Sequence, residues 1–171
     1  MVRRNKPYIE KDDLVSMDVD TEHARNRYPR INELYVRLSP AGGKYFYIDP
    51  ADSDYWIDRL LEYGEFIDPI RVSYDISRKC KLKPMYCYEN LLATFPPKYT
   101  QRRVDVYIGY SLMIKEDLWL QHTWYYDGRT IYESTPLKSS KYFGMKISPI
   151  ELANWLEIYR WRLPRDPNWV D

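Results

Sequence analysis

The stretch that decides the fold covers residues 104–135, which read VDVYIGYSLMIKEDLWLQHTWYYDGRTIYEST. It divides into three segments rich in β-branched and aromatic residues, with turn-forming residues between them: 104–114, 119–126 and 129–135. Asp127-Gly128 separates the last two segments, and this dipeptide is a strong signal for a two-residue hairpin turn. We therefore predict three consecutive antiparallel strands.

His122 lies in the second segment and Glu133 in the third. With Asp127-Gly128 as the turn, His122 pairs directly with Glu133, and directly opposed residues share one face with Cβ atoms about 4.5–5.5 Å apart. Glu133 can then accept a hydrogen bond from one imidazole nitrogen, which fixes the tautomer and raises the basicity of the other nitrogen. A register shift by one residue would place the two side chains on opposite faces. The same predicted face carries two large apolar residues that would shield the pair from water, Trp124 and Ile131.

The second reactive residue is Cys87, in the segment 84–95, which reads PMYCYENLLATF and is predicted to be a helix. Cys87 lies near the start of this helix, where backbone N–H groups and the helix dipole favour thiolate over thiol. Its own backbone N–H could also stabilise an oxyanion. The alternative is structural, because Cys87, Leu91 and Phe95 follow one helical stripe on which a cysteine behaves as a small buried apolar residue. His122 has a matching alternative as a hydrogen-bonded, half-buried histidine of the sheet.

The composition argues against several other function classes. The 26 basic and 25 acidic residues leave a net charge of +1, so we expect neither nucleic acid nor anionic lipid as a partner. The two cysteines are too few for a disulfide scaffold and no Cys/His cluster has zinc spacing, so we expect no metal and no cofactor. No run of 18 apolar residues occurs, so we expect no membrane span and a reducing, cytoplasmic setting. Cys80, in a basic loop, and His23, in a charged N-terminal segment, have no comparable chemical setting.

Four short motifs follow one another along the chain: Cys87-Tyr88-x-Asn90, Tyr107-x-Gly109-Tyr110, His122-x-Trp124 and Glu133-Ser134-Thr135. Their order resembles the core of the papain-like and transglutaminase-like cysteine superfamily, in which a helix bears the cysteine and a strand bears the histidine. The later Tyr142-Phe143-Gly144 also looks like an element of small, uncharacterised bacterial and viral members. The resemblance implies that Cys87 is a nucleophile, His122 its base and Glu133 the orienting acid. It further implies substrate contacts from three residues that accompany the motifs, Asn90, Tyr107 and Trp124.

Two positions depart from the pattern of that superfamily. Glu133 stands where Asp is usual, and Thr123 stands where a small Ala is common. The glutamine that papain-like proteases place upstream of the cysteine has no match in this sequence. The resemblance therefore leaves the second oxyanion donor unassigned.

We predict an α+β fold with a papain-like or transglutaminase-like core, in which the helix bearing Cys87 packs on an antiparallel sheet. Residues 1–30 are predicted to form an N-terminal arm and residues 31–171 a single domain. Within that domain, residues 33–49 are predicted to form a hairpin. Two further helices are predicted over residues 53–63 and 149–162, the second opened by a capping box of Ser148 and Glu151.

These residues lead to two functional hypotheses of different classes. The first is an enzyme, a cysteine hydrolase or transglutaminase-like acyltransferase, that uses Cys87, His122 and Glu133 on a protein or peptide substrate. Its reaction would be peptide or amide hydrolysis, deamidation or acyl transfer, depending on whether water or an amine reaches the thioester. The second is a non-catalytic binding or structural protein on the same fold, which uses its aromatic surface. The sequence leaves the substrate and the oligomeric state open.

Overall fold

The computed structural model of the chain describes residues 14–16, 29–47, 54–79, 87–94, 103–136, 138–148, 150–151 and 154. Its elements in chain order are β1 (Leu14–Ser16), α2 (Pro29–Leu38), the 3-10 helix η2 (Ser39–Ala41), β2 (Tyr45–Tyr47), α3 (Asp54–Tyr63), β3 (Glu65–Ile67), β4 (Arg71–Ser73), α4 (Asp75–Lys79), α5 (Cys87–Thr94), β5 (Asp105–Met113), β6 (Leu118–Tyr126), β7 (Thr130–Glu133) and β8 (Ser139–Ile147). Helices and a sheet both contribute to one structure, so the α+β class is confirmed.

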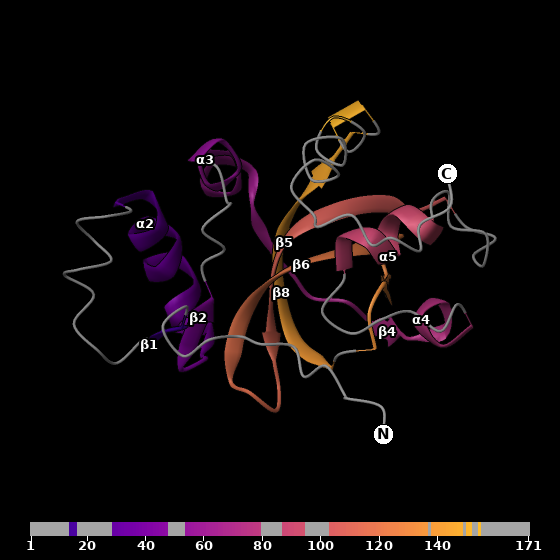
Figure 1. Ribbon diagram of the computed structural model, residues 1–171, viewed down its shortest axis with the longest axis horizontal. Helices are drawn as coiled ribbons and strands as arrows, with labels where there is room; N and C mark the ends of the chain where they lie inside the picture. The colour runs from indigo at the N-terminus through magenta and orange to yellow at the C-terminus, as the bar shows by residue number, and fades with distance from the viewer. Residues whose placement is uncertain are drawn as a thin grey trace, which may run out of the picture.

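The described strands form a single curled sheet with the order β1-β2-β6-β5-β8-β3, and β7 extends it from β6 to β4. The strands β5, β6 and β7 pair antiparallel in succession, as the sequence predicts. The sheet as a whole is mixed, because β2 pairs with β6 and β4 pairs with β7 in parallel. The predicted antiparallel pairing is therefore confirmed for the central strands and is wrong for the pairs β2–β6 and β4–β7. In the view of Figure 1, α2 and α3 are drawn to the left of the central strands, and α4 and α5 to the right.

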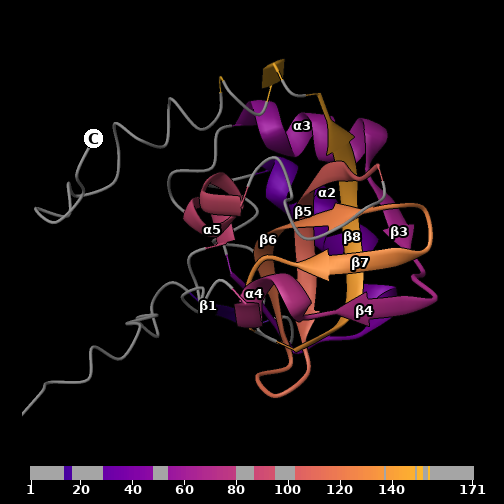
Figure 2. The ribbon, with the colours of Figure 1, turned by 90° about the vertical axis from the view of Figure 1, so that its right-hand side faces the viewer.

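Two separate hydrophobic clusters fill the described structure. The larger cluster joins apolar residues of α2, α3 and α5 to the residues of β5, β6 and β8 that point toward those helices. The smaller cluster lies where the sheet curls and β7 and β4 cross in front of β5 and β8 (Figure 2). It contains one buried residue from each of four strands: Ile67, Trp124, Ile131 and Tyr142. Two members of this smaller cluster contact polar residues buried beside it, because Trp124 packs near His122 and Tyr142 donates to Glu133.

The predicted hairpin over residues 33–49 is wrong in its first half, which is helix α2. Leu34 and Leu38 fit both an alternating strand pattern and a helical stripe, since they are four residues apart. In the structure they are buried with Ile31, while Val36, which the strand pattern would bury, is 57% exposed. Arg37 then fixes the end of the helix by donating to the carbonyl of Gly64 at 2.9 Å. The returning strand of the prediction is present as β2, paired with β1 and β6.

The other predicted elements have mixed outcomes. The helix over residues 53–63 is confirmed as α3, and the helix over residues 84–95 is observed over the shorter range of α5. The capping box forms, because the Glu151 N–H donates to Ser148 Oγ at 3.2 Å and the Ser148 N–H donates to Glu151 Oε2 at 2.9 Å. Most of the helix predicted over residues 149–162 lies outside the described residues. Within the predicted arm of residues 1–30, β1 adds a strand to the edge of β2.

Two glycines allow β5 and β8 to approach closely behind the site. Gly109 and Gly144 are directly paired across these strands. A Cβ atom on Gly109 would lie 2.1 Å from the carbonyl oxygen of Phe143, and one on Gly144 would lie 2.7 Å from the ring of Trp124. The bare backbone of Gly144 therefore provides the space in which the Trp124 ring packs.

Candidate active site

The turn between β6 and β7 sets the register of the site residues. Gly128 has a φ of +87° and Asp127 pairs with Thr130, so the two central residues of the turn are Gly128 and Arg129. A glycine at the first central position is the pattern of a type II′ hairpin. Asp127 Oδ1 supports the turn by accepting from the backbone N–H groups of Arg129 at 2.9 Å and Thr130 at 2.7 Å. The predicted Asp127-Gly128 turn is thus displaced by one residue.

This displacement changes the partner of Glu133 without changing its face. Glu133 pairs with Trp124 and not with His122, so the predicted direct pairing is wrong. Moving the turn by one residue moves the pairing by two residues, and side chains two residues apart on a strand share a face. His122 and Glu133 are therefore diagonal neighbours, a separation that long side chains can span.

His122 and Glu133 meet in the core, as the sequence predicts. The distance between His122 Nε2 and Glu133 Oε2 is 2.6 Å, and the two residues are 3% and 0% exposed. The predicted hydrogen bond is confirmed by this geometry. Trp124 and Ile131, which were predicted to shield the pair, are both fully buried on the same face.

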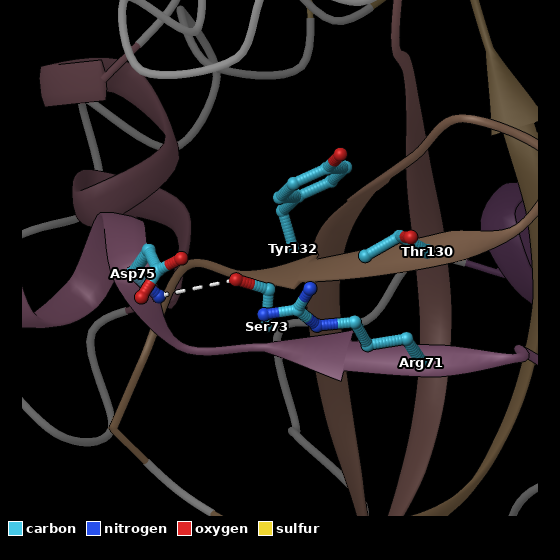
Figure 3. Close-up of a pocket in the computed structure, with 5 residues that line it drawn as sticks. All are labelled: Arg71, Ser73, Asp75, Thr130 and Tyr132. Carbon is cyan, nitrogen blue, oxygen red and sulfur yellow. Dashed lines mark hydrogen bonds between the residues drawn. The ribbon is translucent and has the colours of Figure 1, made fainter.

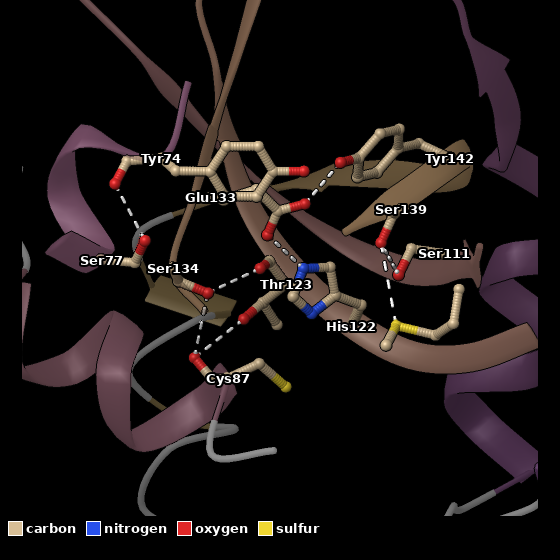
Figure 4. A network of polar contacts seen from close by, with 11 residues as sticks. Tyr74, Ser77, Cys87, Ser111, His122, Thr123, Glu133, Ser134, Ser139 and Tyr142 are labelled. Atoms are coloured by element: carbon tan, nitrogen blue, oxygen red, sulfur yellow. Dashed lines mark hydrogen bonds and ion pairs between the residues drawn. The ribbon is translucent and has the colours of Figure 1, made fainter. Parts of the chain in front are cut away.

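The second oxygen of the Glu133 carboxylate has its own donor. The hydroxyl of Tyr142 on β8 donates to Glu133 Oε1 at 2.5 Å, so each carboxylate oxygen accepts one hydrogen bond (Figure 4). Burial, followed by the charge of Glu133 and this hydrogen bond, raises the pKa of the Tyr142 hydroxyl well above its usual range. The sequence offered no signal for this role, because β8 combines two serines, two lysines and a glycine and was not predicted as a strand.

Cys87 is the first described residue of α5, and side chains from β6 and from the segment after β7 hold this part of the helix. Thr123 donates its hydroxyl to the Cys87 carbonyl at 3.1 Å. Ser134 donates to the Thr123 carbonyl at 2.8 Å and lies 3.5 Å from the same Cys87 carbonyl. One turn further along the helix, Tyr125 donates to the Leu91 carbonyl at 3.0 Å. Thr123, which departs from the pattern of the resembled superfamily, therefore anchors the helix that bears the cysteine.

The Cys87 side chain points toward the side of the His122 ring that faces away from Glu133 (Figure 4). Burial by itself lowers the pKa of His122, because it favours the neutral ring. The Glu133 charge, a hydrogen bond with the Cys87 side chain and the hydrogen bond with Glu133 outweigh burial and raise the pKa of His122 to about 10. His122 is then an imidazolium at neutral pH, between a thiol and a carboxylate.

The three predicted substrate contacts have different positions. Trp124 is 0% exposed, and its ring lies 5.9 Å from that of His122 and stacks on Tyr107 at 6.1 Å. Tyr107 is partly buried behind Trp124, as seen from His122. Asn90 is buried in α5, three residues after Cys87. The structure thus brings Trp124 into contact with the site and places Tyr107 one ring farther away.

Two buried polar atoms near His122 and Glu133 have no hydrogen-bond partner in the described structure. They are Nε1 of Trp124, whose ring packs near His122, and Oγ1 of Thr135, which follows Glu133 by two residues.

Cys80 and His23 lie outside the described residues. Among the residues that the structure describes, no three His, Cys, Asp or Glu side chains are grouped so that they could hold a metal ion. The described helices are all too short or too polar to cross a membrane.

A separate pocket lies on the outer face of β4 and β7 (Figure 3). It has a volume of about 260 Å³ and is lined by five residues: Arg71, Ser73, Asp75, Thr130 and Tyr132. Successive residues of a strand point to opposite faces, so Tyr132 points away from the face that carries Glu133. The pocket is therefore distinct from the Cys87–His122–Glu133 group.

Comparisons with known proteins give no relative for this chain. No protein-family model matches it, and neither a curated protein nor a solved structure matches it. The geometry of the site is therefore what indicates a function for this protein.

Proposed function

We propose that the protein is an enzyme of thiol-dependent acyl chemistry, with Cys87 as the nucleophile, His122 as the acid and base, and Glu133 as the group that orients His122. The observation that carries this proposal is the buried 2.6 Å hydrogen bond between His122 and Glu133, with Cys87 on the other side of the imidazole ring. A nucleophile, a base and a third group that orients the base are the three parts that such a site requires.

The proposed reaction begins with attack of the Cys87 sulfur on a carbonyl carbon of a protein or peptide substrate. In this proposal the backbone N–H of Cys87, in α5, donates to the oxyanion that forms. His122 then gives its proton to the leaving amine, the C–N bond breaks and a thioester with Cys87 remains. Water or a second amine then attacks the thioester carbonyl carbon and gives a proton to His122, the C–S bond breaks and the Cys87 thiolate leaves, which completes hydrolysis, deamidation or transfer.

Two further parts of the proposal follow from the same residues. The resemblance to papain-like and transglutaminase-like proteins supports the assignment of the three roles, because the motif order matches theirs. The free Cys87 thiol supports a reducing, cytoplasmic setting.

The low exposure of Cys87 (6%) and His122 (3%) supports the competing hypothesis of a non-catalytic binding protein, in which Cys87 packs as an apolar residue of the larger cluster.

Acyl transfer to Cys87 decides between these hypotheses. The protein with Cys80→Ala, which leaves Cys87 as the single thiol, is incubated with an activated ester, and the acyl adduct is followed by mass spectrometry of the intact chain. The enzyme hypothesis predicts a thioester on Cys87 that forms and turns over, and loss of both steps in Cys87→Ala. Cys87→Ala should change the free energy of unfolding by less than about 2 kcal/mol, since it removes a single sulfur atom. A thiol that is acylated no faster than free cysteine, with no turnover, would support the binding protein instead.

A further inference from the structure

The Tyr142 hydroxyl is the structural feature that the three assigned roles leave unused. Tyr142 is 1% exposed and lies on β8, opposite Ile67 of β3 and nine residues after Glu133 in the sequence. Its hydroxyl donates to Glu133 Oε1 at 2.5 Å, on the carboxylate oxygen that His122 does not contact. The carboxylate is thus held from two sides by groups that come from two different strands.

The position of the Tyr142 ring is fixed by packing. The ring meets the face of Trp124 edge-on at 5.2 Å, and Trp124 in turn packs at 5.9 Å from His122. Tyr74, in the segment between β4 and α4, hydrogen-bonds to the Tyr142 side chain, and Ser139 is a further hydrogen-bond partner of Tyr142. Figure 4 shows the hydroxyls of Tyr74 and Tyr142 pointing toward one another beside Glu133. These contacts hold the Tyr142 oxygen beside Glu133.

Toward Glu133, the Tyr142 hydroxyl is the hydrogen-bond donor. The charge of Glu133 and the burial of the ring both disfavour the phenolate, so the hydroxyl keeps its proton across the pH range in which proteins are folded. A permanent donor to a buried carboxylate lowers the free energy of the charged carboxylate relative to the neutral acid. In the hydrogen-bonded pair of His122 and Glu133, the free-energy difference between the charged carboxylate and the neutral acid helps to decide which partner holds the shared proton.

We infer that Tyr142 is a positioning residue of the site, whose hydroxyl fixes the Glu133 carboxylate against His122 and thereby keeps the shared proton on the imidazole. The inference deepens the proposed function and rests on it for its catalytic meaning, since a protonated His122 is the group that would favour the Cys87 thiolate. The titratable groups that face the pair come from every neighbouring element: Cys87 of α5, Tyr74 before α4 and Tyr142 of β8.

Titration of His122 by NMR tests this inference in Tyr142→Phe, which removes the hydroxyl and keeps the ring. We expect the midpoint of the His122 titration to fall by about one to two pH units, the size expected for one hydrogen bond to a charged group. Tyr132→Phe is the matched control, because it removes a hydroxyl that donates to a carboxylate, Asp127, at 3.0 Å on the opposite face of β7. The control should leave the His122 midpoint unchanged.

A folded Tyr142→Phe protein whose His122 midpoint equals that of the unmodified protein would overturn the inference. Should Tyr142→Phe fail to fold, the unmodified protein with ¹³C-labelled tyrosine provides the second measurement. The Cζ signal of Tyr142 should then move at the same midpoint as the ring signals of His122, and a Cζ signal that does not respond to this titration would also overturn it. Neither NMR measurement depends on catalytic turnover. If the proposed function is wrong but this inference is right, Cys87 will not be acylated and Tyr142→Phe will still lower the midpoint of the His122 titration.

Discussion

Glu133→Gln is the substitution that tests the buried pair most quantitatively, because it keeps the shape of the side chain and removes its charge. Burial lowers the pKa of His122, but Glu133 and Cys87 outweigh burial and raise this pKa from 6.5 to about 10 in the folded chain. A group whose pKa is raised on folding stabilises the protein fully below its unfolded value and loses that contribution as the pH rises through the folded value. The stabilisation from His122 is therefore complete below about pH 6.5 and disappears by about pH 10.

The size of the effect follows from the same two pKa values. One pH unit corresponds to about 1.4 kcal/mol, so the pair contributes up to about 5 kcal/mol at low pH. Removing one partner of a buried ion pair costs about 3–5 kcal/mol, which is the same range. We expect Glu133→Gln to lower the free energy of unfolding by about 3–5 kcal/mol near pH 6. The loss should become much smaller toward pH 10, where His122 of the unmodified protein has released its proton.

Urea unfolding followed by tryptophan fluorescence measures this difference at intervals between about pH 6 and about pH 10. Subtracting the variant from the unmodified protein removes the contributions of tyrosines, lysines and Cys80 that titrate in the same range. Tyr132→Phe provides a control whose difference from the unmodified protein should not change with pH. A Glu133→Gln difference that stays constant across the range would refute the reasoning, because it would mean that His122 holds no extra proton in the folded chain.

Three further substitutions test how the site is held. Thr123→Val removes the hydroxyl that donates to the Cys87 carbonyl, so it should lower the free energy of unfolding in urea by about 1 kcal/mol and slow alkylation of Cys87. An unchanged alkylation rate would show that this hydrogen bond does not affect the reactivity of the thiol. Thr135→Val removes a buried hydroxyl oxygen without a hydrogen-bond partner, so urea unfolding should show no loss beyond about 0.5 kcal/mol, and a larger loss would reveal a partner. Gly144→Ala places a Cβ atom 2.7 Å from both the Ile108 carbonyl oxygen and the Trp124 ring, so it should cost about 2 kcal/mol or more in thermal unfolding; a melting temperature equal to that of the unmodified protein would contradict the close packing.

The sequence predicted the centre of the sheet because strong local signals coincide there. The strands β5, β6 and β7 are rich in aromatic and β-branched residues and are separated by turn residues. The exact turn was not predicted, since Asp127-Gly128 favours a type I′ turn while the structure uses Gly128-Arg129 with Asp127 as a side-chain acceptor. The His122–Glu133 contact survived that error because a two-residue change of pairing preserves the face.

The elements that were missed depend on long-range pairing. The strands β3 and β4 are three residues each, too short for an alternation pattern, and they are stabilised by β8 and β7. Helix α2 was predicted as a strand because Leu34 and Leu38 fit both periods, and only packing against α3 distinguishes them. Tyr142 reaches Glu133 from β8, which pairs with β5 and β3 and not with β7, so no local pattern could have connected the two residues.

The most direct test of the central claim is the alkylation rate of Cys87 as a function of pH, in a protein with Cys80→Ala. An activated thiol beside a protonated His122 should react with iodoacetamide near pH 6 about tenfold or more faster than free cysteine, and His122→Gln should remove this advantage while the fold is retained. A Cys87 that reacts at the rate of an ordinary thiol, with the same pH dependence in the His122→Gln variant, would contradict the account.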